Sequence, residues 1–98
     1  MAKFIAQEFD AQAVQCYLHE TAKLEHLRAR RRADLVVIES GPLEDPWPRA
    51  RLRRVGVHQW RLEMATHTGR WETTPFQAQR DEVLRLLVES FGWTLTPD

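Results

Sequence analysis

Residues 57–76 contain two arms in which hydrophobic and polar residues alternate, separated by turn-compatible residues. This pattern predicts a β-hairpin on which the rest of the chain is built. The first arm places four residues on one face: His58, Trp60, Leu62 and Met64. In the second arm Trp71 and Thr73 take that face, and Gly69 suits the turn because glycine accepts a positive φ. The hairpin therefore predicts one buried and one solvated side.

Two turn lengths are open for this hairpin. A four-residue loop sets Met64 opposite Trp71, whereas a three-residue loop sets Met64 against Glu72. We favour the four-residue loop, because a one-residue slip sends every side chain to the other face and would take Trp71 out of the core. The same register sets Glu63 across from Glu72, a like-charge pair that neighbouring arginines would have to offset.

Two further strands are predicted before the hairpin. Residues 35–38 form a short β-branched run, and residues 49–54 alternate so that Ala50 and Leu52 face the core. A three-residue connection would place Ala50 opposite Trp60 and Leu52 opposite His58. The outer face of the sheet then shows these side chains: Arg49, Arg51, Arg53, Gln59, Arg61, Glu63, Arg70 and Glu72.

Helical spacing of apolar residues predicts an amphipathic helix at each end of the chain. The first runs over residues 11–30 with Asp10 as its N-cap, and the arginines of residues 28–32 then suit its negative C-terminal dipole. The second starts with Thr74 as N-cap and Pro75 in the first turn, and ends at Gly92 as the C′ residue.

These elements predict a single α+β domain over residues 1–98, with two helices on one face of a three- to four-stranded antiparallel sheet, in the order α-β-β-β-β-α. The predicted core comprises Trp60, Leu62, Met64, Trp71, Tyr17, Leu18, Leu24, Leu84, Leu87 and Phe91. Trp47 lies between Pro46 and Pro48 in a stiff loop, where it is either a lid on the core or an exposed contact. We favour the lid.

Charge is balanced over the chain but uneven along it. The formal net charge is zero, so global charge does not indicate nucleic acid or a membrane surface. Residues 28–54, however, hold eight arginines against four acids. Arginine suits bidentate contacts with phosphate or carboxylate, although a GC-rich genome would produce the same bias.

Motifs for catalysis or metal binding are missing from the sequence. His19 and His26 lie two helical turns apart, too far to share one ion, and no CxxC, HExxH, GxSxG or glycine-rich phosphate loop occurs. His58 has the parity of a core residue. We therefore expect a protein that is not an enzyme and needs no cofactor or metal.

Cysteine usage and hydropathy indicate a cytoplasmic protein. Cys16 is the only cysteine, which fits a reducing compartment. No apolar run has the length of a signal peptide or of a membrane span.

Two classes of function fit these features. The first is a small interaction or accessory protein that contacts a protein partner or a second copy of itself, since arginine and tryptophan are enriched at interface hot spots. The alternative is sequence-nonspecific nucleic-acid binding through an arginine-rich sheet face. The candidate contact residues for either are Arg49, Arg51, Arg53, Arg61, Arg70, Arg30, Arg31, Arg32 and Trp47.

One stretch of the chain resembles a known group of proteins. Ala50, Leu52 and Trp60, then Gly69 to Trp71, then a helix with Leu84 and Leu87 are similar to an uncharacterised family of small bacterial proteins with paired hairpin tryptophans. The resemblance implies a bacterial source and an α+β domain, and carries over no functional residue. Residues 72–74 depart from the aromatic-rich ending of that pattern.

Overall fold

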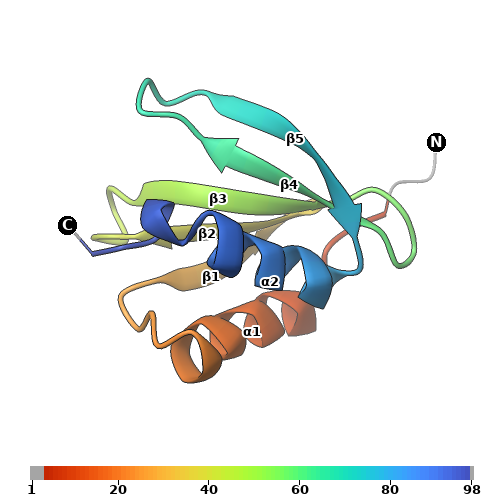
Figure 1. Cartoon of the computed structure of the whole chain (residues 1–98), viewed down its shortest axis with the longest axis horizontal. Coiled ribbons are helices and arrows are strands. Elements are labelled where there is room, and N and C mark those ends of the chain that lie inside the picture. The colour runs from red at the N-terminus through yellow and green to blue at the C-terminus, as the bar shows by residue number, and fades with distance from the viewer. Residues whose placement is uncertain (1–3, 98) are drawn as a thin grey trace.

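The structure, a computed structural model, describes residues 4–97, so residues 1–3 and 98 of the predicted domain lie outside it. The helices are α1 (Glu8–Cys16), which continues into a π-helical turn (Tyr17–Thr21), and α2 (Arg80–Ser90), which a 3₁₀ turn (Gly92–Thr94) follows. The strands are β1 (Arg28–Arg32), β2 (Leu35–Ser40), β3 (Trp47–Arg54), β4 (Trp60–Ala65) and β5 (Trp71–Ala78). Figure 1 shows this α-β5-α order.

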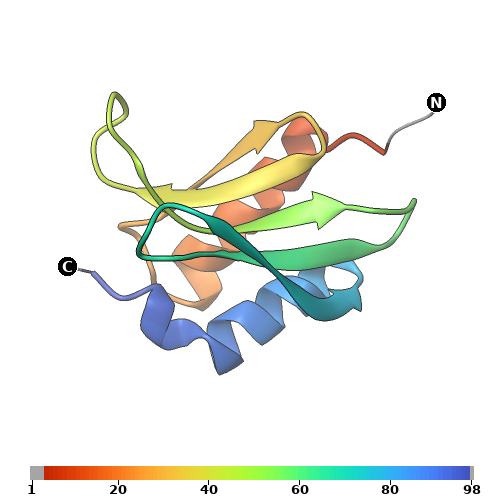
Figure 2. The ribbon, with the colours of Figure 1, turned by 90° about the horizontal axis from the view of Figure 1, so that it is seen from above.

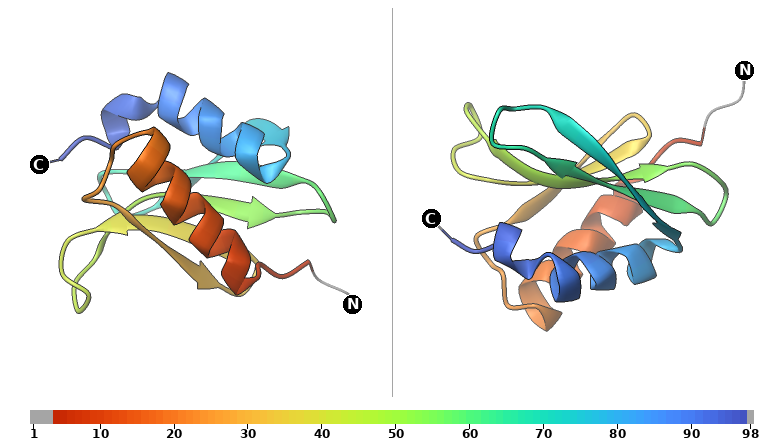
Figure 3. Two further views of the ribbon diagram at one scale, coloured as in Figure 1. Left: turned by 90° about the horizontal axis from the view of Figure 1, so that it is seen from below. Right: turned by 45° about the horizontal axis from the view of Figure 1, so that its top comes forward.

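The five strands form one antiparallel sheet in the order β1-β2-β3-β4-β5. Both helices cover the same face of the sheet, which the left view of Figure 3 shows with α1 and α2 in front. Figure 2 looks onto the opposite face, which carries no helix. The predicted α+β class with two helices on one face is confirmed, but the prediction of three to four strands missed one.

The missed strand is β1, which is formed by the arginines that we placed in the last turns of the first helix. The helix ends earlier because Lys23 adopts φ 60°, which a helix cannot accommodate. A two-residue turn with Ala33 at φ 54° then pairs Arg32 with Leu35. The start of the helix also differs, since Gln7 is the N-cap and Asp10 accepts a hydrogen bond from the Gln7 N–H.

The pairing of β3 with β4 keeps the predicted faces but not the predicted partners. Ala50 pairs with Met64 and Leu52 with Leu62, and both pairs face the core. His58 is exposed in the connection, so the prediction that it faces inward is wrong. The connection is longer than three residues because β4 begins only at Trp60.

The hairpin of β4 and β5 takes the register that we did not favour. Met64 pairs with Glu72, and Gly69 at φ 82° closes a three-residue loop in which the Thr66 N–H donates to the Arg70 carbonyl. Trp71 consequently shares the face of Glu63, away from the helices. Glu63 pairs with Thr73, so the predicted like-charge pair does not form.

Strand β5 runs beyond the point where we predicted the second helix to begin. Pro75 lies within the strand, which is tolerated because β5 is at the edge of the sheet. The Thr74 hydroxyl donates to the Leu62 carbonyl at a register irregularity instead of capping a helix. The helix starts at Arg80, and its end at Ser90 leaves Gly92 at C′ as predicted.

The core fills the space between the helices and the inner face of the sheet. Of the predicted core, Trp60, Leu62, Leu18, Leu84 and Leu87 are buried, and Tyr17, Leu24, Met64 and Phe91 are partly buried. Trp71 is absent from this core. Trp47 is 52% exposed, so it is not the lid that we favoured. No helix in residues 4–97 is long and apolar enough to span a membrane.

Trp60 tests this packing directly. It is only 4% exposed, so Trp60→Ala should lower the free energy of unfolding by about 3–5 kcal/mol, as truncation of a buried aromatic does. Trp93→Ala is the matched control, because Trp93 is 74% exposed and its loss should change little. Urea denaturation of both variants measures the difference, and equal midpoints would contradict this core.

Candidate functional site: the arginine face of the sheet

Arginine is the most frequent residue on the face of the sheet that carries no helix. The strand register places six of them there: Arg28, Arg30 and Arg32 on β1, Arg51 and Arg53 on β3, and Arg61 on β4. We call this surface, which faces the viewer in Figure 2, the arginine face. Alternate residues of a strand point to opposite sides, which is why arginines separated by two positions gather on it.

Glu39 is one of two carboxylates buried in the arginine face. Its side chain is almost fully buried, and its two oxygens accept hydrogen bonds from Arg28 Nε at 2.9 Å and Arg30 Nη2 at 3.0 Å. Arg28 also donates to the Gly41 carbonyl. A buried carboxylate needs such partners, so Glu39 holds both arginines in place on β1.

Glu63 is the second buried carboxylate, and three arginines surround it. Arg51 Nε donates to Oε1 at 2.6 Å and Arg53 Nε to Oε2 at 3.1 Å. Arg53 also donates to Asp34, at 2.8 Å. The guanidinium of Arg61 is 3.6 Å from Glu63, close enough for attraction, while its buried Nε has no hydrogen-bond partner among the described residues.

These contacts shift the pKa values of Glu63 and Arg53. Burial by itself raises the pKa of Glu63, but hydrogen bonds from Arg53 and Arg51, together with their charges, lower it below its ordinary value. The hydrogen bond to Glu63 raises the pKa of Arg53, and the lesser effect of burial opposes it. Glu63 is thus an anion at neutral pH.

Trp71 lies against the guanidinium of Arg51 on this face. The Arg51 guanidinium carbon is 4.1 Å from the centre of the Trp71 ring, a cation–π contact. Beside it is a hollow of about 520 Å³ with Leu35, Val37 and Glu39 from β2 at its base. The rest of its lining is Arg30, Arg32, Pro46, Pro48, Arg51 and Trp71.

The arginine face carries more positive than negative charge. Six arginines stand against Glu39, Glu63 and Asp34. Arg32 is exposed and makes no ion pair with another described residue, and the Arg30 side chain is half exposed. The hollow therefore combines the apolar side chains of Leu35 and Val37 with accessible cationic side chains.

The structure brings together only part of the predicted site. Arg30, Arg32, Arg51, Arg53 and Arg61 lie on the arginine face as described, whereas four predicted residues do not. Arg49 donates to Ser40 and to the carbonyls of Thr94 and Thr96, Arg31 donates to the Ala6 carbonyl, Arg70 is at the hairpin tip, and Trp47 does not line the hollow.

Two residues of the arginine face were missed. Arg28 was assigned to a helix, and Trp71 was assigned to the core. The alternation of Arg28, Arg30 and Arg32 was the available signal for a strand. The Trp71 position depends on the hairpin register, which pattern alone left open between two loop lengths.

The side chains of His19, His26 and Cys16 lie within hydrogen-bonding distance of other groups of the chain. His19 Nε2 and His26 Nε2 each lie 2.6 Å from a backbone carbonyl, of Leu27 and Leu95 respectively. A hydrogen bond to Glu20 raises the pKa of the exposed Cys16 thiol. Within residues 4–97 no group of three or more histidine, cysteine or acidic side chains is placed to hold a metal ion.

The Glu63 contacts predict a pH-dependent stability. Because the folded pKa of Glu63 is below its ordinary value of 4.5, its contribution is fully present above that pH and disappears as the pH falls through the folded value. Glu63→Gln keeps the shape but loses the charge, and should lower the free energy of unfolding at pH 7 by roughly 2–3 kcal/mol, since Arg51 and Arg53 retain some access to water.

Urea denaturation between pH 7 and pH 3 checks this. The parent should lose more stability than Glu63→Gln over this range, because the variant has no carboxylate left to protonate at this site. Glu25→Gln, at an exposed position, should behave like the parent. A Glu63→Gln variant as stable as the parent at pH 7 would contradict the role of this carboxylate.

Comparisons with known proteins identify no relative. No protein-family model, no curated protein and no solved structure matches the chain. The resemblance in residues 50–87 to small bacterial proteins with paired hairpin tryptophans stays a prediction.

Proposed function

We propose that the protein is a non-enzymatic interaction module that binds an acidic segment of a partner protein on its arginine face. The observation that carries this proposal is the arrangement of arginines over Glu39 and Glu63 around a hollow that Leu35 and Val37 also line. A cytoplasmic location, argued from the single cysteine, belongs to the same proposal.

Preorganisation of the arginines supports tight recognition. A free arginine loses side-chain entropy when it binds a carboxylate, whereas Arg28, Arg51 and Arg53 are already held by their glutamates. Each guanidinium has five N–H donors, so those not used internally remain for a partner. Carboxylates of a partner would meet donors that are fixed in direction.

The spacing of the β1 arginines suits an extended acidic chain. Residues two apart on a strand are separated by roughly 6.7 Å, and alternate side chains of an extended peptide repeat at the same distance. Arg28, Arg30 and Arg32 form such a row. An apolar side chain two positions beyond the last acid would point to the same side of the peptide, and would reach Leu35, Val37 and Trp71 in the hollow.

Sequence-nonspecific nucleic-acid binding is the second candidate. The positive excess of the face and the indole of Trp71 beside Arg51 favour it, because phosphates seek arginines and bases stack on aromatic rings. Two features favour a protein instead. The net charge of the chain is zero, and Trp71 already has a guanidinium against its ring.

Fluorescence anisotropy separates the two candidates. We expect a labelled peptide that has glutamate at alternate positions, followed by leucine or phenylalanine at the next such position, to bind more tightly than a single- or double-stranded oligonucleotide of equal charge. Arg32→Glu should weaken peptide binding about tenfold, since Arg32 has no ion pair to lose within the described residues and a like charge would now face the acids. A lysine-for-glutamate peptide should not bind.

The matched control is Arg85→Glu, an equal charge change at an exposed position on α2. It should leave peptide affinity unchanged. Oligonucleotide binding that falls log-linearly with salt and exceeds peptide binding would favour the nucleic-acid candidate. Failure of both ligands at low salt would contradict the proposal.

A further inference from the structure

We propose that a second copy of this chain docks on the exposed edge of β5, in an antiparallel arrangement that sets Arg70 of each copy against Glu82 of the other. This self-association uses the edge of the sheet next to α2 and leaves the arginine face free. It is therefore independent of the function proposed above.

The two edges of the sheet differ in their capacity to accept another strand. Strand β1 carries four arginines in five residues, and Gln15 from α1 accepts a hydrogen bond from the Ala29 N–H. Two such strands would repel each other. Strand β5 has only Glu72 as a charged residue among its eight, and no other strand pairs with its outer edge in the described residues.

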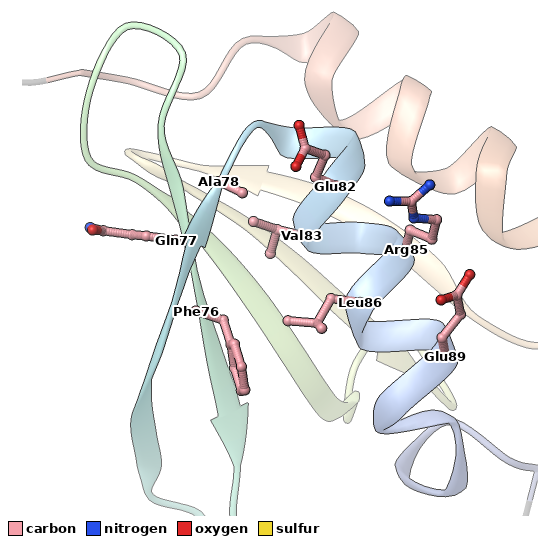
Figure 4. A pocket seen from close by; sticks show the side chains of 8 residues that line it. All are labelled: Phe76, Gln77, Ala78, Glu82, Val83, Arg85, Leu86 and Glu89. Carbon is pink, nitrogen blue, oxygen red and sulfur yellow. The ribbon is translucent and has the colours of Figure 1, made fainter.

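An apolar groove lies beside this edge, between β5 and α2. Phe76 and Ala78 from the strand and Val83 and Leu86 from the helix line it, as Figure 4 shows. Phe76 is 38% exposed although it is a large hydrophobic residue, and its ring contacts Phe91 at its edge. The groove gives an added strand apolar surface to cover on the helix side of the sheet.

Two-fold symmetry determines which residues would meet. In an antiparallel pair of β5 strands, the end that begins at Trp71 lies beside the Ala78 end of the second copy. Arg70 directly precedes Trp71, and Glu82 lies next to Ala78 in the groove lining. Both side chains are exposed and make no ion pair or side-chain hydrogen bond with another described residue.

The same arrangement avoids repulsion within the new strand pair. Each Glu72 would lie near Phe76 of the second copy, not opposite the other Glu72. Pro75 has no N–H, and the ladder is irregular opposite Thr74, so the middle of the strand contributes few hydrogen bonds. The contacts of Phe76 and of the two Arg70–Glu82 pairs at the ends would carry the interface.

Sedimentation velocity over a concentration series tests this inference with the full chain. The mass should rise with concentration from 11.5 kDa towards twice that value. Arg70→Glu and Glu82→Arg should each raise the dimer dissociation constant about tenfold, because the symmetry turns two attractive pairs into two repulsive ones. The double variant, which exchanges the two charges, should return the constant to within about threefold of the parent.

Two further variants keep the outcome unambiguous. Glu25→Arg, an equal charge change at an exposed position outside this groove, and Arg32→Glu on the arginine face should both dimerise like the parent. Circular dichroism confirms that each variant is folded. A parent that stays monomeric up to about 1 mM, or a charge exchange that fails to restore association, would overturn the inference.

Discussion

The ion pairs of Glu39 and Glu63 are the interaction on which this structure depends. Each carboxylate is buried on a sheet face that no helix covers, where it would be costly without partners. The partners come from neighbouring strands: Arg28 and Arg30 lie on β1 beside Glu39, and Arg51 lies on β3 beside Glu63. A slip of one residue in either strand pair would turn a glutamate towards the apolar core, so the charges reinforce the register that the hydrophobic residues also require.

This arrangement explains how a chain of zero net charge presents two unlike surfaces. Arginines exceed acids on the face without helices, and the glutamates beneath them fix their directions while cancelling only part of their charge. Around β5 the charge is low, and the neighbouring α2 contributes Glu82, Arg85 and Glu89. The proposed acidic partner and the proposed second copy would therefore occupy separate parts of the molecule.

Local pattern was sufficient for much of the fold. The alternation around Trp60 and Leu62 identified the core side of the sheet, and the helical spacing around Leu84 identified the buried face of the C-terminal helix but not its start. The local pattern predicted the wrong element where a long-range contact determines the structure. Arg28 to Arg32 suit a helix end by the dipole rule, but Glu39 is eleven residues beyond Arg28 and becomes its partner only when β1 pairs with β2.

The candidate site was predictable to a similar extent. The prediction placed Arg51, Arg53 and Arg61 on the correct face, because the side to which a strand residue points does not depend on its exact partner in the neighbouring strand. Trp71 was misplaced since one residue of loop length decides its face, and Arg49 since a register irregularity in the β2–β3 pairing turns it towards Ser40. Neither the loop length nor the register irregularity can be predicted from local hydropathy.

The proposed function requires the arginine face to be a preorganised receptor for acidic groups. An NMR titration with the glutamate peptide, which follows the Nε–Hε resonances of the arginine side chains, tests this requirement. We expect the signals of Arg30, Arg32 and Arg51 to shift, while those of Arg54 and Arg80, away from this face, stay in place. Equal shifts of all arginines, or shifts confined to Arg54 and Arg80, would contradict it.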